Sequence, residues 1–69
     1  MEYKAAFLYQ SGGIECGVQL TADTDDAAVH AAQVLAAKRG AQLFSLREQV
    51  GSEQTRVVRY MFNDTGETK

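Results

Sequence analysis

His30 and Asp26 are the first pair of residues in this chain whose types and spacing could do chemistry. Four positions separate them, the spacing at which two side chains meet on one face of a helix, so the carboxylate could orient the imidazole as a base or metal ligand. His30 is the only histidine, and no cysteine or further carboxylate stands at helical spacing to complete a set of metal ligands. We therefore interpret the pair as a surface contact.

Cys16 is the only cysteine. The alternating pattern around it places it on the apolar side of a strand with Ile14 and Val18, where a thiol behaves as a small hydrophobic group. A nucleophilic thiol needs an activating base, and the sequence shows none beside it. A single cysteine cannot form an internal disulfide, which for so small a domain favours a reducing, cytoplasmic location.

Two short motifs suggest catalysis or phosphate binding but lack the surroundings that such sites need. Residues 64–66 spell the Asp-Thr-Gly of aspartic proteases, yet they lie three residues from the chain end rather than in a β framework that pairs two carboxylates. Residues 11–13, Ser-Gly-Gly, precede a strand instead of a helix and lack the lysine of a phosphate-binding loop. The sequence thus predicts a protein that is not an enzyme and that uses no metal or other cofactor.

Arginine and tyrosine side chains form the one combination that predicts a binding chemistry. Sheets that bind single-stranded nucleic acid stack bases on aromatic rings and hold phosphates with arginines. The candidates are Arg47, Arg56 and Arg59, together with Tyr3, Tyr9 and Tyr60. The net charge of −2 and the pI of about 5.2 oppose this interpretation, and the aromatic-and-glycine motif of the common RNA-binding sheet domain is absent. Weak nucleic-acid binding is therefore an alternative and not the main prediction.

The length of the chain limits what it can build. With 69 residues it forms one domain, expected over residues 1–62, and residues 63–69 are polar and expected to fray as a C-terminal tail. A domain of this size has a small core and little material for a deep cleft. No apolar run approaches membrane-spanning length, and no basic-then-apolar signal pattern opens the sequence.

Local patterns predict four strands and one helix. The expected strands, which are rich in aromatic and β-branched residues, cover residues 3–9, 14–22, 41–48 and 55–62. Residues 24–40 predict the helix, because acidic residues open it, alanines fill it, and Gly40 stops it. The expected fold class is α+β, a two-layer ββαββ arrangement in which one helix packs on one face of a four-stranded sheet. The helix would connect the second and third strands, which would then run parallel.

One helix covers only one side of such a sheet, and the sequence does not make the other side cleanly polar. Strict alternation would group Leu43 with Arg47 on the third strand, and Val57 with Arg59 and Met61 on the fourth. An exposed apolar patch on a small domain often marks an interaction surface. The predicted interaction surface consists of Leu43, Arg47, Val57, Arg59 and Met61.

The main functional prediction is a small, non-catalytic interaction module. We expect it to self-associate as a homodimer through the sheet face or edge that the helix leaves uncovered, because burying that surface would stabilise a marginal fold. The alternatives are another protein partner, weak single-stranded nucleic-acid binding, and a small-ligand-binding accessory subunit. A membrane is not expected as a partner.

Overall fold

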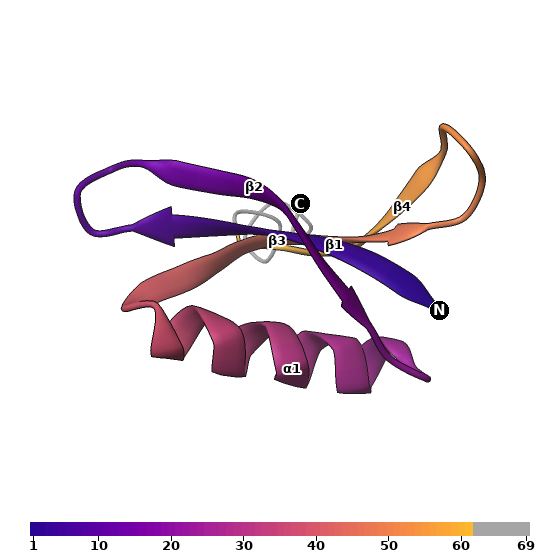
Figure 1. Ribbon diagram of the computed structural model, residues 1–69, viewed down its shortest axis with the longest axis horizontal. Helices are drawn as coiled ribbons and strands as arrows, with labels where there is room; N and C mark the ends of the chain where they lie inside the picture. The colour runs from indigo at the N-terminus through magenta and orange to yellow at the C-terminus, as the bar shows by residue number, and fades with distance from the viewer. Residues whose placement is uncertain (62–69) are drawn as a thin grey trace, which may run out of the picture.

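The computed structural model describes residues 1–61 of the chain, and these residues form the predicted ββαββ fold. Four strands make one sheet, and a single helix packs on one of its faces (Figure 1). The elements are β1 (Glu2–Tyr9), β2 (Ile14–Thr21), α1 (Asp25–Lys38), β3 (Ala41–Gln49) and β4 (Thr55–Tyr60). The α+β fold class is therefore confirmed.

The strand order in the sheet is β2-β1-β3-β4, and each neighbouring pair is antiparallel. Since β2 and β3 both run antiparallel to β1, they run parallel to each other, as predicted, but β1 lies between them. The connection through α1 therefore passes over the central strand β1 and not merely from one neighbour to the next. The two edges of the sheet are β2 and β4.

Local sequence signals set both ends of α1. The side-chain oxygen of Thr24 accepts a hydrogen bond of 3.1 Å from the backbone N–H of Ala27, which caps the first turn. Asp25 and Asp26 lie in that turn, where the helix dipole favours negative charge. At the other end Gly40 has a φ of 67°, a left-handed conformation that glycine adopts without steric cost.

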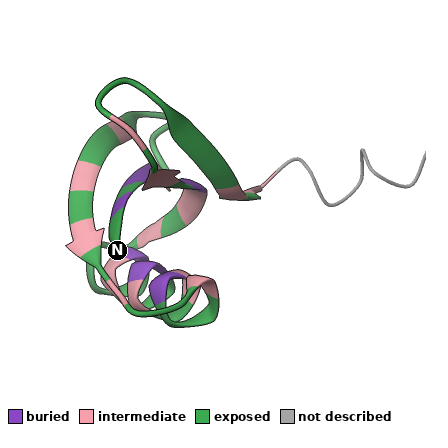
Figure 2. Cartoon of the chain, turned by 90° about the vertical axis from the view of Figure 1, so that its right-hand side faces the viewer, coloured by how far each residue is buried: buried purple, intermediate pink, exposed green. Residues whose placement is uncertain are grey.

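The core lies between α1 and the central strands. Ala28, Ala32 and Ala36 repeat every fourth residue, so they share one side of α1, and all three are buried. Their small side chains let the helix axis lie close to the sheet. Tyr3 and Phe7 of β1 and Leu46 of β3 supply the larger buried side chains. Figure 2 shows the buried residues gathered where the helix faces the sheet, whereas β4 and the loop before it contain exposed and intermediate residues but no buried one.

A β-bulge in β2 changes which residues share a face. The register moves from Ala5 opposite Val18 to Phe7 opposite Glu15, so β2 carries one extra residue there, next to Gly17 with its φ of 77°. Val18 still packs against the core, but the alternation is inverted before the bulge. The prediction that Ile14 and Cys16 share the buried face with Val18 was therefore wrong, and both side chains are exposed.

Two further bulges invert the alternation of β3 and β4. The β1–β3 register moves from Ala6 opposite Ser45 to Phe7 opposite Leu43, which leaves Phe44 as the extra residue. Leu43 consequently packs toward the core, not on the face of Ser45 where simple alternation placed it. In β4 the extra residue is Val58, because the register moves from Leu46 opposite Arg59 to Arg47 opposite Val57.

The described part of the domain ends at Met61, directly after the last strand. Strand β4 ends at Tyr60, whereas the predicted strand ran to Phe62, and the predicted tail at residues 63–69 lies outside the described residues. Within residues 1–61, no helix has both the length and the apolar character needed to cross a membrane.

Candidate interaction surface

The side of the sheet that faces away from α1 is the candidate site, and we call it the uncovered face. Along β1, the residues of this face alternate with the residues that point into the core. The strand registers then show which residues of β2, β3 and β4 lie on the same face. Ile14 and Cys16 belong to it because Glu15, between them, points to the helix side, where Arg39 binds its carboxylate. The uncovered face consists of Glu2, Lys4, Ala6, Leu8, Ile14, Cys16, Gln19, Thr21, Gln42, Phe44, Ser45, Arg47, Gln49, Thr55, Val57 and Tyr60.

One half of the uncovered face, next to the β1–β2 turn, is apolar. The rings of Phe44 and Tyr60 meet edge to face, with their centroids 5.3 Å apart and an interplanar angle of 84°. Ala6 and Ser45, which lie opposite each other, are only 6% and 9% exposed although no helix covers this side. Ile14 extends the apolar half to the sheet edge and is 48% exposed. This half is a packed cluster that is open to solvent at one edge.

The other half of the uncovered face is polar, and its two cations, Lys4 and Arg47, outnumber its one carboxylate, Glu2. Lys4 of β1 and Arg47 of β3 are directly opposite each other in the ladder. Two like charges in this position destabilise a sheet. Arg47 donates a hydrogen bond of 3.3 Å to the hydroxyl of Thr55, and within residues 1–61 neither cation takes part in an ion pair. The pair therefore supplies a local positive potential beside the apolar half.

The five residues of the predicted interaction surface do not lie together. Arg47 and Val57 are opposite each other on the uncovered face. Leu43, Arg59 and Met61 lie on the helix side, where they line an open hollow with Gln33, Ala36 and Ala37 of α1. The bulges at Phe44 and Val58 cause this division. Simple alternation did not assign Phe44, Tyr60 and Ile14 to the interaction surface. The one local sequence signal for a bulge was the glycine at position 17, which inverts the alternation of β2.

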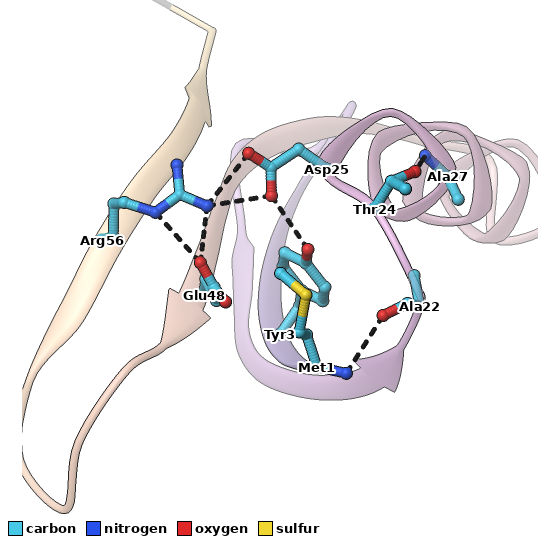
Figure 3. A network of polar contacts seen from close by, with 8 residues as sticks. All are labelled: Met1, Tyr3, Ala22, Thr24, Asp25, Ala27, Glu48 and Arg56. Atoms are coloured by element: carbon cyan, nitrogen blue, oxygen red, sulfur yellow. Dashed lines mark hydrogen bonds and ion pairs between the residues drawn. The ribbon is translucent and has the colours of Figure 1, made fainter.

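The helix side is held at the N-terminal end of α1 by a polar cluster that we call the Asp25 clamp (Figure 3). The buried Tyr3 hydroxyl donates to Oδ1 of Asp25 at 2.9 Å, and the Arg56 guanidinium donates to both carboxylate oxygens at 2.9 Å. Arg56 also binds Glu48 of the neighbouring strand. The hydrogen bonds from Arg56 and Tyr3 lower the pKa of Asp25. Burial, with the contact to Asp25, raises the pKa of Tyr3 to about 12.

The C-terminal end of α1 has an equivalent cluster, the Glu15 clamp. The Tyr9 hydroxyl donates to Oε1 of Glu15 at 2.6 Å, and Arg39 donates to the same oxygen at 2.9 Å. The Arg39 guanidinium also lies over the ring of Phe7, 5.3 Å from its centroid. The hydrogen bond from Tyr9, followed by that from Arg39, lowers the pKa of Glu15. Both ends of the helix are thus tied to the sheet by a tyrosine, a carboxylate and an arginine.

The two clamps bear directly on the nucleic-acid alternative. Tyr3, Tyr9 and Arg56 face the helix side and are engaged there, so they do not project from the uncovered face. Arg59 also lies on the helix side. Of the six residues that suggested a nucleic-acid surface, Arg47 and Tyr60 are the two that the uncovered face presents.

Within residues 1–61, His30 and Asp26 gain no partner that would make them a site. His30 and Asp26 are exposed on α1, and no group of three or more histidine, cysteine or acidic side chains is placed to hold a metal within residues 1–61. In the same part of the chain, every buried side-chain nitrogen or oxygen has a hydrogen-bond partner. The hollow at the β1–β2 turn, lined by Leu8, Tyr9 and Gly40 among others, is open and brings together no set of catalytic side chains.

Comparison with known proteins gives no match, whether with protein-family models, curated proteins or solved structures.

Proposed function

We propose that this protein is a small, non-catalytic interaction module that self-associates through the sheet face or edge that α1 leaves uncovered. The observation that carries the proposal is the apolar half of the uncovered face. Phe44 and Tyr60 form a packed pair there, and Ile14 leads from that half to the open sheet edge. A second copy of the chain is the partner with which such a surface can be self-complementary.

The energetic reason lies in the size of the domain. A chain of 69 residues has a net stability of roughly 3–10 kcal/mol at about 0.05–0.15 kcal/mol per residue. Each 100 Å² of apolar surface removed from water contributes about 2.5 kcal/mol before the cost of association. Covering a modest part of the uncovered face would therefore change stability by a large fraction of its total.

The distribution of polar groups also supports binding over catalysis. The carboxylates with lowered pKa values, Asp25 and Glu15, are each held by an arginine and a tyrosine on the helix side. Such groups anchor α1 to the sheet, and their bonds to arginine and tyrosine account for both lowered pKa values. We also place the module in the reducing cytoplasm, in keeping with an exposed thiol at Cys16.

The proposal is tested by sedimentation of the wild-type chain and of two matched variants over the micromolar range, where a Kd of about 1 μM corresponds to roughly −8 kcal/mol. Ile14→Lys adds a charge to the uncovered face, and Val34→Lys adds the same charge at a valine that is 40% exposed on α1. We expect self-association of wild type and Val34→Lys, and a weaker association of Ile14→Lys. A wild-type chain that stays monomeric throughout would refute the proposal.

Nucleic acid is a second candidate ligand for the same face. Lys4 and Arg47 are opposite each other there, and Tyr60 of β4 pairs with Ser45, two residues before Arg47 in β3. Its test is a titration of a labelled single strand at low and moderate salt, since phosphate contacts make binding salt-dependent. Binding that weakens with salt and is lost in Arg47→Gln would favour this candidate. No signal change at low salt would exclude it.

A further inference from the structure

The two edges of the sheet differ in charge, and this difference bears on how a second copy could bind. The β4 edge is a strand of six residues that carries Arg59, which has no ion-pair partner within residues 1–61, and Arg56, which Asp25 and Glu48 bind. The β2 edge has eight residues, and its one charged side chain, Glu15, is held internally by Tyr9 and Arg39. Natural edge strands are commonly protected from pairing by charged side chains. By this criterion β4 is protected and β2 is open.

The backbone hydrogen bonds also show which groups of β2 point away from β1. Met1 and Ala22 exchange both backbone hydrogen bonds, each of 3.1 Å. Hydrogen-bonded and non-hydrogen-bonded pairs alternate in an antiparallel ladder, so Thr21 and Gln19 direct their backbone groups outward. Beyond the bulge, the Tyr9–Gly13 bond of 2.8 Å sets the alternation, and Ile14 and Cys16 point outward.

These four outward positions fit one another about a two-fold axis near Gly17. An antiparallel pair of β2 strands in the register Cys16 opposite Gln19 also places Ile14 opposite Thr21. Each pair joins two outward-pointing backbone positions on the uncovered face, and it brings Glu15 opposite Leu20 on the helix side. The bulge is what permits this match, because it inverts the alternation between the two halves of the strand.

We infer that two copies of this chain pair through β2, antiparallel and with Cys16 of each copy opposite Gln19 of the other, to form one continuous eight-stranded sheet. The inference rests on the proposed self-association and names the surface that carries it. Both helices then lie on one side of the joint sheet, and the two uncovered faces become continuous through Ile14. Pairing β4 with itself would instead bring Arg56 and Arg59 of the two copies close together. Pairing of β2 with β4 would leave free edges and propagate.

The test is a disulfide between copies. Cα atoms of a hydrogen-bonded antiparallel pair are about 5.5 Å apart, which suits a disulfide. Gln19→Cys places a thiol at an exposed position opposite the native Cys16 of the other copy. We expect rapid formation of a covalent dimer under mild oxidation. Mass spectrometry of the digested product should identify a disulfide that joins Cys16 of one copy to the introduced thiol of the other.

Two controls measure the background from random collision. Gln19→Cys combined with Cys16→Ser keeps one thiol on β2 but removes its partner, and should form little covalent dimer. Val57→Cys combined with Cys16→Ser places one exposed thiol on β4, on the same face, and should react at a similarly slow rate. Equal rates in all three variants would overturn the inference.

A second variant addresses the backbone directly. Gln19→Pro removes an N–H that points away from β1, so the ladder inside the monomer keeps its hydrogen bonds. We expect this variant to retain the far-UV circular dichroism of the fold and to lose self-association in sedimentation. If wild type self-associates but the disulfide in Gln19→Cys does not form and Gln19→Pro still associates, the β2 pairing is wrong while the proposed function stands. A wild-type monomer at all concentrations removes both.

Discussion

Tyr3 and Tyr9 lie six residues apart on the same side of β1, and each is the donor of one clamp. Each hydroxyl donates to a carboxylate that also binds an arginine, at opposite ends of α1. Each tyrosine therefore packs its ring against the sheet and helix while its hydroxyl makes a polar contact. The two residues explain how a helix with an alanine face, which offers little apolar area, is held in a defined position on the sheet.

The ionisation of Tyr3 provides a residue-scale prediction. Its pKa is raised to about 12, first by burial and then by the hydrogen bond and charge of Asp25. A raised pKa means that the neutral phenol stabilises the fold fully below the unfolded value of about 10, and that this stability is lost as pH rises through about 12. The difference in ultraviolet titration between wild type and Tyr3→Phe should contain one phenol ionising near pH 12.

The matched control for that titration is Asp25→Asn, which removes the neighbouring negative charge. The Tyr3 ionisation should then move to lower pH while remaining above the ordinary tyrosine value, because burial persists. A Tyr3 ionisation that is unchanged in Asp25→Asn would show that the hydrogen bond between the two side chains is not formed in solution.

Among the elements, β2 depends on Gly17 for its bulge, and its substitution gives a prediction at this scale. Gly17 has a φ of 77°, and no atom lies within 4 Å of where a Cβ would be. Gly17→Ala should therefore cost only the backbone strain of a left-handed residue, about 1–2 kcal/mol in the free energy of unfolding. Gly13 does not have a positive φ, and an added Cβ would lie an ordinary 3.8 Å from the Ser11 hydroxyl. Urea denaturation should therefore show a smaller loss of unfolding free energy in Gly13→Ala than in Gly17→Ala.

The alanine face of α1 gives the second element-scale prediction. Ala32 is fully buried, whereas Ala37 is exposed on the same helix. Ala32→Leu should force the helix away from the sheet and cost about 1–3 kcal/mol in the free energy of unfolding. Ala37→Leu has nearly the same helix propensity and should change stability by less than about 0.5 kcal/mol. Similar urea midpoints for the two variants would contradict close packing at Ala32.

The elements also show how far the sequence could predict this molecule. The helix was predictable because its signals are local: Thr24 caps it, and Gly40 follows its end. The strands were predictable from composition, and so was the uncovered side of the sheet. The composition of the interaction surface was not, because the bulges at Phe44 and Val58 arise from pairing between distant segments. A bulge of one residue exchanges the two faces of a strand, so Leu43 was assigned to the wrong side.

At the scale of the whole molecule, the two clamps connect the helix to both edges of the sheet. Arg56 reaches Asp25 from β4, and Glu15 of β2 reaches Arg39 directly after α1. The two edge strands, which bury few side chains, are thereby tied to the helix that covers the core. Each tie joins a carboxylate to a guanidinium, so the arrangement of layers depends on pH more than the apolar core does.

Acid unfolding tests this dependence. The pKa values of Asp25 and Glu15 are both lowered, so the unfolded chain binds protons more readily than the folded one. Their contribution to stability is fully present above the unfolded values of about 4 and is lost as pH falls through the lower folded values. The melting temperature of wild type should fall steeply below about pH 4. In the variant that combines Asp25→Asn with Glu15→Gln, the melting temperature at neutral pH should be lower than that of wild type, and it should fall less on acidification. An equally steep fall in this variant would contradict the two clamps.

The position of β1 has a consequence for synthesis of the chain. It is synthesised before the other three strands, yet it lies between β2 and β3, so one of its edges stays unpaired until residues 41–49 have followed. A lone two-stranded hairpin and a lone 14-residue helix are both marginal in water. The segment from β1 to α1 is therefore exposed to chaperones and proteases until β3 has been synthesised and can pair with β1.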